Sequence, residues 1–121
     1  MAMPGYELPN PELRYLIDSD AYQTLSQYGT PEIVVPAGFV TDGNSAPWWI
    51  RWLFPRYDRS LPACIVHDYC YGGTMGRKTA DRLLFTNMKR LGFPSWKAGL
   101  MYLGVRIGGH SRYDYRQRKA A

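Results

Sequence analysis

The sequence has few cysteines, no long apolar run and no signal-peptide pattern, which are features of secreted and membrane-anchored proteins. Its 121 residues include only two cysteines, Cys64 and Cys70. No apolar run approaches the ~20 residues that a membrane-spanning helix requires. The first residues, MAMPGYELPNPEL, show neither the basic segment nor the apolar core of a signal peptide. We therefore expect no transmembrane segment, and either an intracellular protein or one exported by another route. A single domain of this length can bury a core without disulfides.

The two cysteines lie six residues apart in a segment that reads as a helix. At 1.5 Å per residue their Cα atoms are ~9 Å apart along the helix axis. A disulfide requires Cα atoms within ~7 Å of each other. We therefore expect two reduced thiols.

Acidic residues are scarce in the second part of the chain. Residues 1–75 carry a net charge of −4 and residues 76–121 a net charge of +9, which gives +5 in total. A basic region of this kind favours an anionic surface as partner: nucleic acid, lipid headgroups or an acidic protein. A solvated face without a partner remains the alternative, and no known nucleic-acid-binding motif is present.

The pattern of apolar and turn-forming residues predicts a small α+β domain. Residues 1–45 read as strands and loops, with strands at 13–17 and 32–35 and between them a polar hairpin connection with some strand at its ends. Residues 46–108 read as helical. Residues 109–121 form a basic tail, expected to be a surface arm or partly disordered. Helices are predicted over 60–71, 78–91 and 96–107. The last of these is apolar nearly all round, which predicts a central position in the fold.

The segment CIVHDYCY, residues 64–71, has three readings: a catalytic base, a metal site or a packed helix. On a helix, Cys64, His67 and Tyr71 share one face. The cysteines and His67 do not converge on one ion, and a structural zinc site needs four ligands. The spacing therefore argues against zinc held by the cysteines.

The short connector GGTMG predicts an antiparallel hairpin of two helices. Residues equally far from the turn then lie opposite each other, which places Asp81 against His67 and Arg77 near Tyr71. A carboxylate that binds one imidazole nitrogen fixes the tautomer and leaves the other nitrogen available as a base. We expect His67 and Asp81 to be catalytic, with Arg77 and Tyr71 contacting an anionic substrate.

The turn-rich segment FVTDGNSAP follows a predicted strand and carries short polar side chains. Asp42, together with Asp68, is a candidate ligand of a divalent cation, either calcium, magnesium or zinc. Asn44 and Ser45 are candidate substrate contacts. Three tryptophans follow closely, at positions 48, 49 and 52. They form either a lid over the core or an exposed patch that meets a membrane or a partner.

Two resemblances add to these expectations. Residues 33–108 resemble a family of unknown function found in bacteriophages and prophages. The resemblance lies in four segments and their order: VPAGFVTDGNSAP, HDYCY, RKTADRLLFTNMKRLG and VRIGG. This resemblance implies a phage or prophage origin. Its motif positions are Asp42, Ser45, Pro47, His67, Asp68, Tyr71, Arg77 and Asp81.

The second resemblance is local. The pattern C-x-x-H-D-x-C-Y is similar to the active-site helix of the calcium-dependent secretory phospholipases (the A-two class). It implies His67 as the base that activates water and Asp68 as a calcium ligand. The glycine-rich calcium loop of those enzymes is replaced here by APWWIRWLF, and their disulfides are absent.

Two functions therefore stay open. One is a phage-encoded, metal-assisted hydrolase acting on an ester, amide or phosphodiester bond. The other is a non-catalytic virion protein or host-interacting protein in which His67 and Asp68 are structural. Either protein would act in the cytoplasm of the infected bacterium or in the virion.

Overall fold

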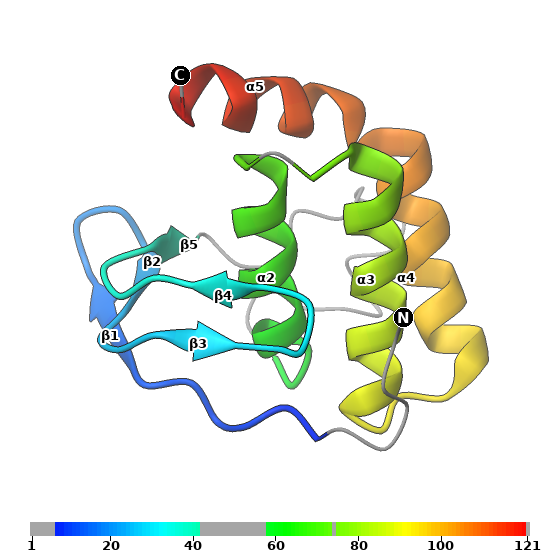
Figure 1. Cartoon of the computed structure of the whole chain (residues 1–121), viewed down its shortest axis with the longest axis horizontal. Coiled ribbons are helices and arrows are strands. Elements are labelled where there is room, and N and C mark those ends of the chain that lie inside the picture. The colour runs from blue at the N-terminus through cyan, green and yellow to red at the C-terminus, as the bar shows by residue number, and fades with distance from the viewer. Residues whose placement is uncertain (1–6, 42–57, 74, 121) are drawn as a thin grey trace.

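The computed structural model describes residues 7–41, 58–73 and 75–120, and it confirms a small α+β fold. Five short strands come first: β1 (Leu13–Leu16), β2 (Ala21–Thr24), β3 (Tyr28–Gly29), β4 (Val34–Val35) and β5 (Val40–Thr41). Four helices follow: α2 (Leu61–Tyr71), α3 (Arg77–Arg90), α4 (Ser95–Gly108) and α5 (His110–Ala120). The strands lie on one side of α2, and α3 and α4 lie on the other (Figure 1).

The strands form two small antiparallel sheets, ordered β1-β2-β5 and β3-β4. The polar segment between the two predicted strands contains β2 and β3, which is more strand than the sequence predicts. Thr24 holds it in place through its backbone, since its N–H donates to Phe39 O and its carbonyl accepts from Gly38 N. Its buried side chain adds two further bonds. Its Oγ1 donates to Pro36 O at 2.9 Å and accepts from Phe39 N at 2.9 Å. These bonds attach β2 to the loop that leads into β5.

The helix α2 begins after Ser60 and has Pro62 in its first turn, as the sequence predicts. It is buried on nearly every side, because the sheets, α3 and α5 surround it. The side chains of Ile65, Val66 and Tyr71 are almost fully inaccessible. This burial positions His67 and Asp68 inside the protein.

The helix α3 ends in a Schellman motif, as Gly92 predicts. Gly92 has φ +91°, which L-residues rarely adopt, and its N–H donates to Lys89 O. Phe93 N donates to Met88 O at 3.1 Å. The predicted apolar face of α3 packs on α2 and α4, and its members are Ala80, Leu83, Leu84, Met88 and Leu91.

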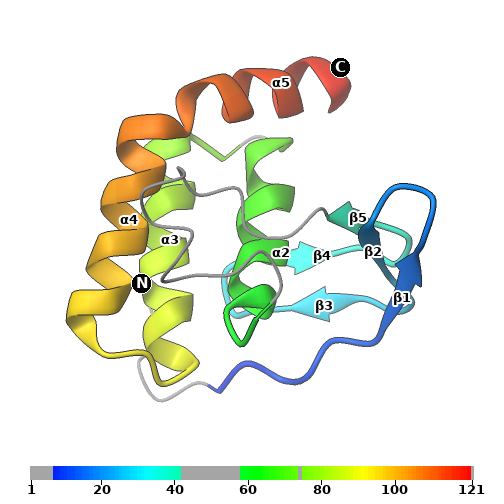
Figure 2. The ribbon, with the colours of Figure 1, turned by 180° about the vertical axis from the view of Figure 1, so that it is seen from behind.

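The prediction that residues 96–107 form a central helix is wrong. The helix exists as α4, but it packs on α3 and α5 at the outer edge of the fold (Figure 2). Its buried residues are Ala98, Met101 and Gly104. The apolar residues on its other face point outward, because no other described element covers them. The apolar residues of this segment predict a helix that is apolar on both faces. They do not indicate which of the two faces packs on the rest of the protein.

The basic tail is a helix, α5, which lies across the ends of α2 and α4 (Figures 1 and 2). Gln117 holds it there: its Nε2 donates to Tyr71 O at 2.7 Å and to Gly73 O at 2.8 Å. These are carbonyls at the end of α2 that have no partner within the helix. Among the described residues, no helix is long and apolar enough to span a bilayer.

Candidate functional site

The predicted contact between His67 and Asp81 is present. Nε2 of His67 lies 2.7 Å from Oδ1 of Asp81, across the antiparallel hairpin of α2 and α3. Asp81 is inaccessible to solvent and His67 is 8% exposed. The short connector accounts for this pairing, because both residues lie about one helical turn from it.

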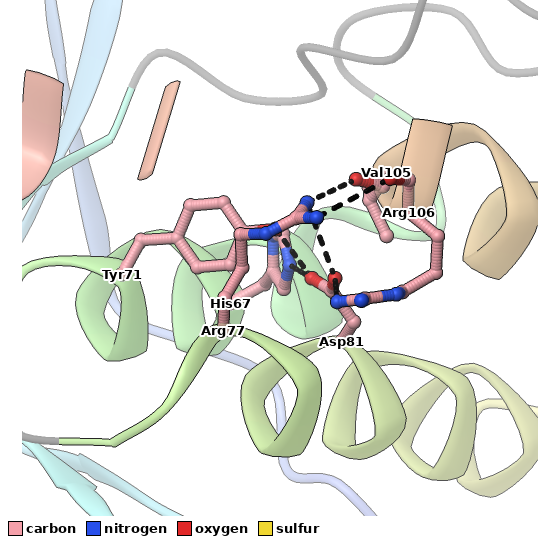
Figure 3. A network of polar contacts seen from close by, with 6 residues as sticks. All are labelled: His67, Tyr71, Arg77, Asp81, Val105 and Arg106. Atoms are coloured by element: carbon pink, nitrogen blue, oxygen red, sulfur yellow. Dashed lines mark hydrogen bonds and ion pairs between the residues drawn. The ribbon is translucent and has the colours of Figure 1, made fainter. Parts of the chain in front are cut away.

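Asp81 also binds donors that extend the contact into a network (Figure 3). The Tyr71 hydroxyl donates to the same oxygen as His67. Arg106, from α4, donates from Nη1 to the other oxygen, Oδ2, at 2.9 Å. Nη1 of Arg77 forms an ion pair with Oδ2 at 3.8 Å. We call these five residues the Asp81 network.

The network keeps Asp81 charged. Burial alone would raise the pKa of its carboxyl, but the hydrogen bonds from His67, Tyr71 and Arg106 outweigh burial and hold the pKa below its ordinary value. Burial and the same hydrogen bond raise the pKa of the Tyr71 hydroxyl, so Tyr71 stays a neutral donor. The site therefore contains a buried carboxylate.

Arg77 lies where the hairpin predicts, but its hydrogen bonds go to α4. Nη1 donates to Val105 O at 3.1 Å and Nη2 to Arg106 O at 3.4 Å. A guanidinium at the last turn of a helix interacts favourably with the helix dipole. Val105 O also accepts from Gly109 N, so Arg77 adds a second hydrogen bond to this carbonyl. These contacts hold the end of α4 against α3. A role for Arg77 in binding anions stays a prediction.

Arg106 is the member of the network that sequence analysis missed. The signal was its occurrence near the end of an otherwise apolar segment, VRIGG. A charged residue there is usually solvated, and nothing in the spacing links it to Asp81, 25 residues earlier. Only the packing of α4 on α3 brings the two together.

Asp68 faces away from His67, as adjacent residues on a helix do. Its Oδ2 accepts from Thr41 Oγ1 at 2.7 Å and from Nη2 of Arg116 at 3.4 Å. Asp68 therefore joins β5 and α5 to α2, while His67 joins α3. The described residues contain no group of three or more His, Cys, Asp or Glu side chains that could hold a metal ion.

The ring of Tyr71 connects the network to α5. Its centroid lies 4.1 Å from that of His67 and 5.1 Å from that of Tyr113, with an edge-on arrangement for the second pair. Tyr113 comes from α5. The predicted substrate contact of Tyr71 is untested, but its hydroxyl is already engaged with Asp81.

Cys64 and Cys70 are free and buried, as expected. Burial raises the pKa of each thiol to about 12, with a further contribution from Asp68 in the case of Cys64. Both are therefore neutral thiols near neutral pH and are poor nucleophiles or metal ligands.

The remaining predicted site residues lie outside the described part of the chain. These are Asp42, Asn44 and Ser45, together with the tryptophans at 48, 49 and 52. The role of Asp42 as a cation ligand therefore stays a prediction.

Comparison with known proteins gives one family. Residues 18–105 match the family model described as a protein of unknown function (DUF1353). No curated protein and no solved structure matches the chain. The matched span includes His67, Tyr71, Arg77 and Asp81, whereas Arg106 and α5 follow it. Since the match covers well over half of the sequence, the chain belongs to the DUF1353 family.

Proposed function

We propose that this protein is a hydrolase in which His67 acts as a general base and Asp81 positions it. The observation that carries the proposal is the hydrogen bond between Nε2 of His67 and a buried, charged carboxylate. A carboxylate only accepts hydrogen bonds, so the proton lies on Nε2. Nδ1 of the neutral ring then keeps its lone pair. It forms no hydrogen bond with any residue that the structure describes.

The proposed reaction uses this lone pair. Nδ1 takes a proton from a water molecule as the water oxygen forms a bond to the carbonyl carbon or phosphorus of the substrate. The bond to the leaving group then breaks, and the leaving group receives the proton from Nδ1. Asp81 stabilises the imidazolium that exists between these steps. Tyr71 and Arg106 hold the Asp81 carboxylate in place and leave it no freedom to rotate.

The predicted divalent cation does not fit the described contacts of Asp68. The buried Asp68 carboxylate accepts hydrogen bonds from a hydroxyl and a guanidinium, and the positive charge of Arg116 opposes a second cation there. We therefore derive no step through a metal. A cation held by Asp42 stays a separate proposal, since that residue lies outside the described part of the chain.

The test is hydrolysis of a panel of p-nitrophenyl esters, p-nitroanilides and bis(p-nitrophenyl) phosphate. Replacing His67→Ala is expected to lower the rate on any accepted substrate by about 10²–10⁴-fold, the usual contribution of a general base. The matched control is His110→Ala, which removes the other histidine of the chain and should leave the rate unchanged. Circular dichroism must show that both variants are folded. If folded His67→Ala is as active as the wild type, the proposal fails.

A non-catalytic role is the second candidate, and the three hydrogen bonds and the Arg77 ion pair of Asp81 favour it. The residues involved come from three helices, so the network also fastens α2, α3 and α4 together. On this reading, His67→Ala lowers the stability by about 1–3 kcal/mol and changes no activity. The resemblance to phage proteins supports a phage or prophage origin under either function. The protein would then act in the host cytoplasm or in the virion, with a virion or host protein as partner.

A further inference from the structure

An apolar stripe runs along the outer face of α4. Trp96, Leu100, Leu103 and Ile107 recur at positions i, i+4, i+7 and i+11, which places them within a sector of about 60° on a helix. Trp96, Leu103 and Ile107 are 62%, 47% and 58% exposed. Leu100 is half-buried. We call these four residues the α4 stripe.

The α4 stripe is contiguous, which distinguishes it from ordinary exposed apolar residues. Single apolar side chains are common on protein surfaces, but continuous patches mark sites that meet another surface. The opposite face of α4 already packs on α3 through Ala98 and Met101. The packing of α4 on α3 therefore does not require apolar side chains at the four positions of the α4 stripe.

Lysine side chains lie at the Trp96 end of the α4 stripe. Lys89 donates to Ser95 Oγ at 2.8 Å, beside Trp96. Lys97 lies next to Trp96 in the sequence, with its Nζ 5.5 Å from the Phe93 ring.

The two helices α3 and α4 carry little negative charge. α4 contains no Asp or Glu, and the single acidic residue of α3, the buried Asp81, pairs with Arg106. α3, which packs against α4, adds the exposed Lys78 and Arg82. The exposed charged side chains of α3 are therefore all basic, and α4 adds no negative charge.

We infer that the α4 stripe and its flanking cations dock on an anionic lipid bilayer. An apolar helix face with Trp, Leu and Ile, bordered by Lys and Arg, inserts at the boundary of headgroups and acyl chains while the cations meet phosphates. A tryptophan at one end fits the preference of this residue for the interface. A second copy of the chain fits less well, since pairing of two stripes would bring two helix pairs with a net positive charge together. The inference is independent of the hydrolase proposal.

The test is co-sedimentation of the full chain with vesicles. The wild type is expected to bind vesicles of equimolar phosphatidylglycerol and phosphatidylcholine, to bind phosphatidylcholine vesicles far less, and to lose binding at high salt. The double substitution Leu103→Asp and Ile107→Asp should lower the partition coefficient by about tenfold or more. Both positions are exposed, so the variant should keep the wild-type unfolding midpoint.

The matched control is the double substitution Ile17→Asp and Leu25→Asp. These residues are 79% and 56% exposed and lie near β1 and β2, away from α4. The control adds the same charge and should bind anionic vesicles about as well as the wild type. The inference is overturned if the wild type does not bind, if both double variants bind equally, or if salt has no effect. It is also overturned if the α4 substitutions abolish only self-association, or if the chain binds nucleic acid but not vesicles.

Discussion

At the scale of single residues, Asp81 decides the character of the site. A buried carboxylate is costly unless donors surround it. Here His67 and Tyr71 share one oxygen, while Arg106 and Arg77 face the other. The same arrangement orients an imidazole for proton transfer and ties three helices together. Catalysis and stability therefore depend on the same atoms.

Replacing Asp81→Asn should lower both stability and any hydrolytic rate. The substitution removes the charge that pairs with Arg106, which we expect to cost about 3 kcal/mol of unfolding free energy, since a buried pair is broken from one side. It also frees the His67 ring from a fixed tautomer. Urea denaturation measures the first effect and p-nitrophenyl ester hydrolysis the second.

The control for this variant is Asp114→Asn on the exposed face of α5, expected to change stability by less than about 0.5 kcal/mol. An Asp81→Asn protein as stable as the wild type would show that the network contributes nothing to folding.

At the scale of elements, α2 is the part on which the others depend. The consecutive residues His67 and Asp68 bind different parts of the fold. His67 binds Asp81 of α3, and Asp68 binds side chains of β5 and α5. The junction between α4 and α5 is equally close-packed. A Cβ on Gly109 would lie 2.3 Å from Val105 O and 2.8 Å from the Tyr71 hydroxyl.

Two alanine substitutions should therefore have opposite effects. Gly109→Ala is expected to destabilise the protein by about 1–3 kcal/mol, because the backbone at Val105 must move. Gly99→Ala lies within α4 with no atom within 4 Å of the added carbon. It should stabilise by up to about 1 kcal/mol through helix propensity. Urea denaturation of both variants measures the difference, and equal stabilities would contradict the close packing at Gly109.

At the scale of the whole molecule, two apolar clusters meet along α2 and α3. One lies among α2, α3 and α4, and the other joins α2 and α3 to the strands. A polar contact also joins the strands to the helices. The Arg90 guanidinium donates from Nη1 and Nη2 to the two carboxylate oxygens of Glu32, at 2.9 and 2.7 Å. The Arg90 side chain is almost fully buried, so this pair is shielded from solvent.

This pair predicts a pH dependence of stability. The hydrogen bond and charge of Arg90 hold the pKa of Glu32 below its ordinary value of 4.5. Because the folded-state pKa is the lower one, the pair stabilises the fold above that ordinary value. The contribution is lost as the pH falls through the lowered folded-state pKa.

We expect Glu32→Gln to cost about 2 kcal/mol at about pH 7 and progressively less as the pH falls below 4.5, so that the cost at about pH 3 is smaller. Thermal unfolding at the two pH values measures this change. The control is the exposed Glu7→Gln, which should follow the wild type at both. A cost for Glu32→Gln that does not change with pH would refute the ion pair.

Much of the helical half was predictable because its signals are local. Ser60 and Pro62 mark the start of α2, Gly92 marks the end of α3, and the spacing of Leu84 and Met88 identifies a packed face. The strands were harder. β2 pairs with β5, and Thr24 adds bonds to Pro36 and Phe39, more than ten residues away.

The sequence by itself determined the helices α2, α3 and α4, the absence of a bond between the two cysteines and the pairing of His67 with Asp81. Each depends on helix geometry or on a short connector, which leave few arrangements. Only the tertiary structure decided that the basic tail forms α5, that Arg106 completes the network, that Asp68 binds β5 and α5, and that no other described element covers the outer face of α4. These features depend on which helix and strand surfaces pack together between residues far apart in the chain. The spacing of apolar residues within one segment does not indicate which other segment it packs against.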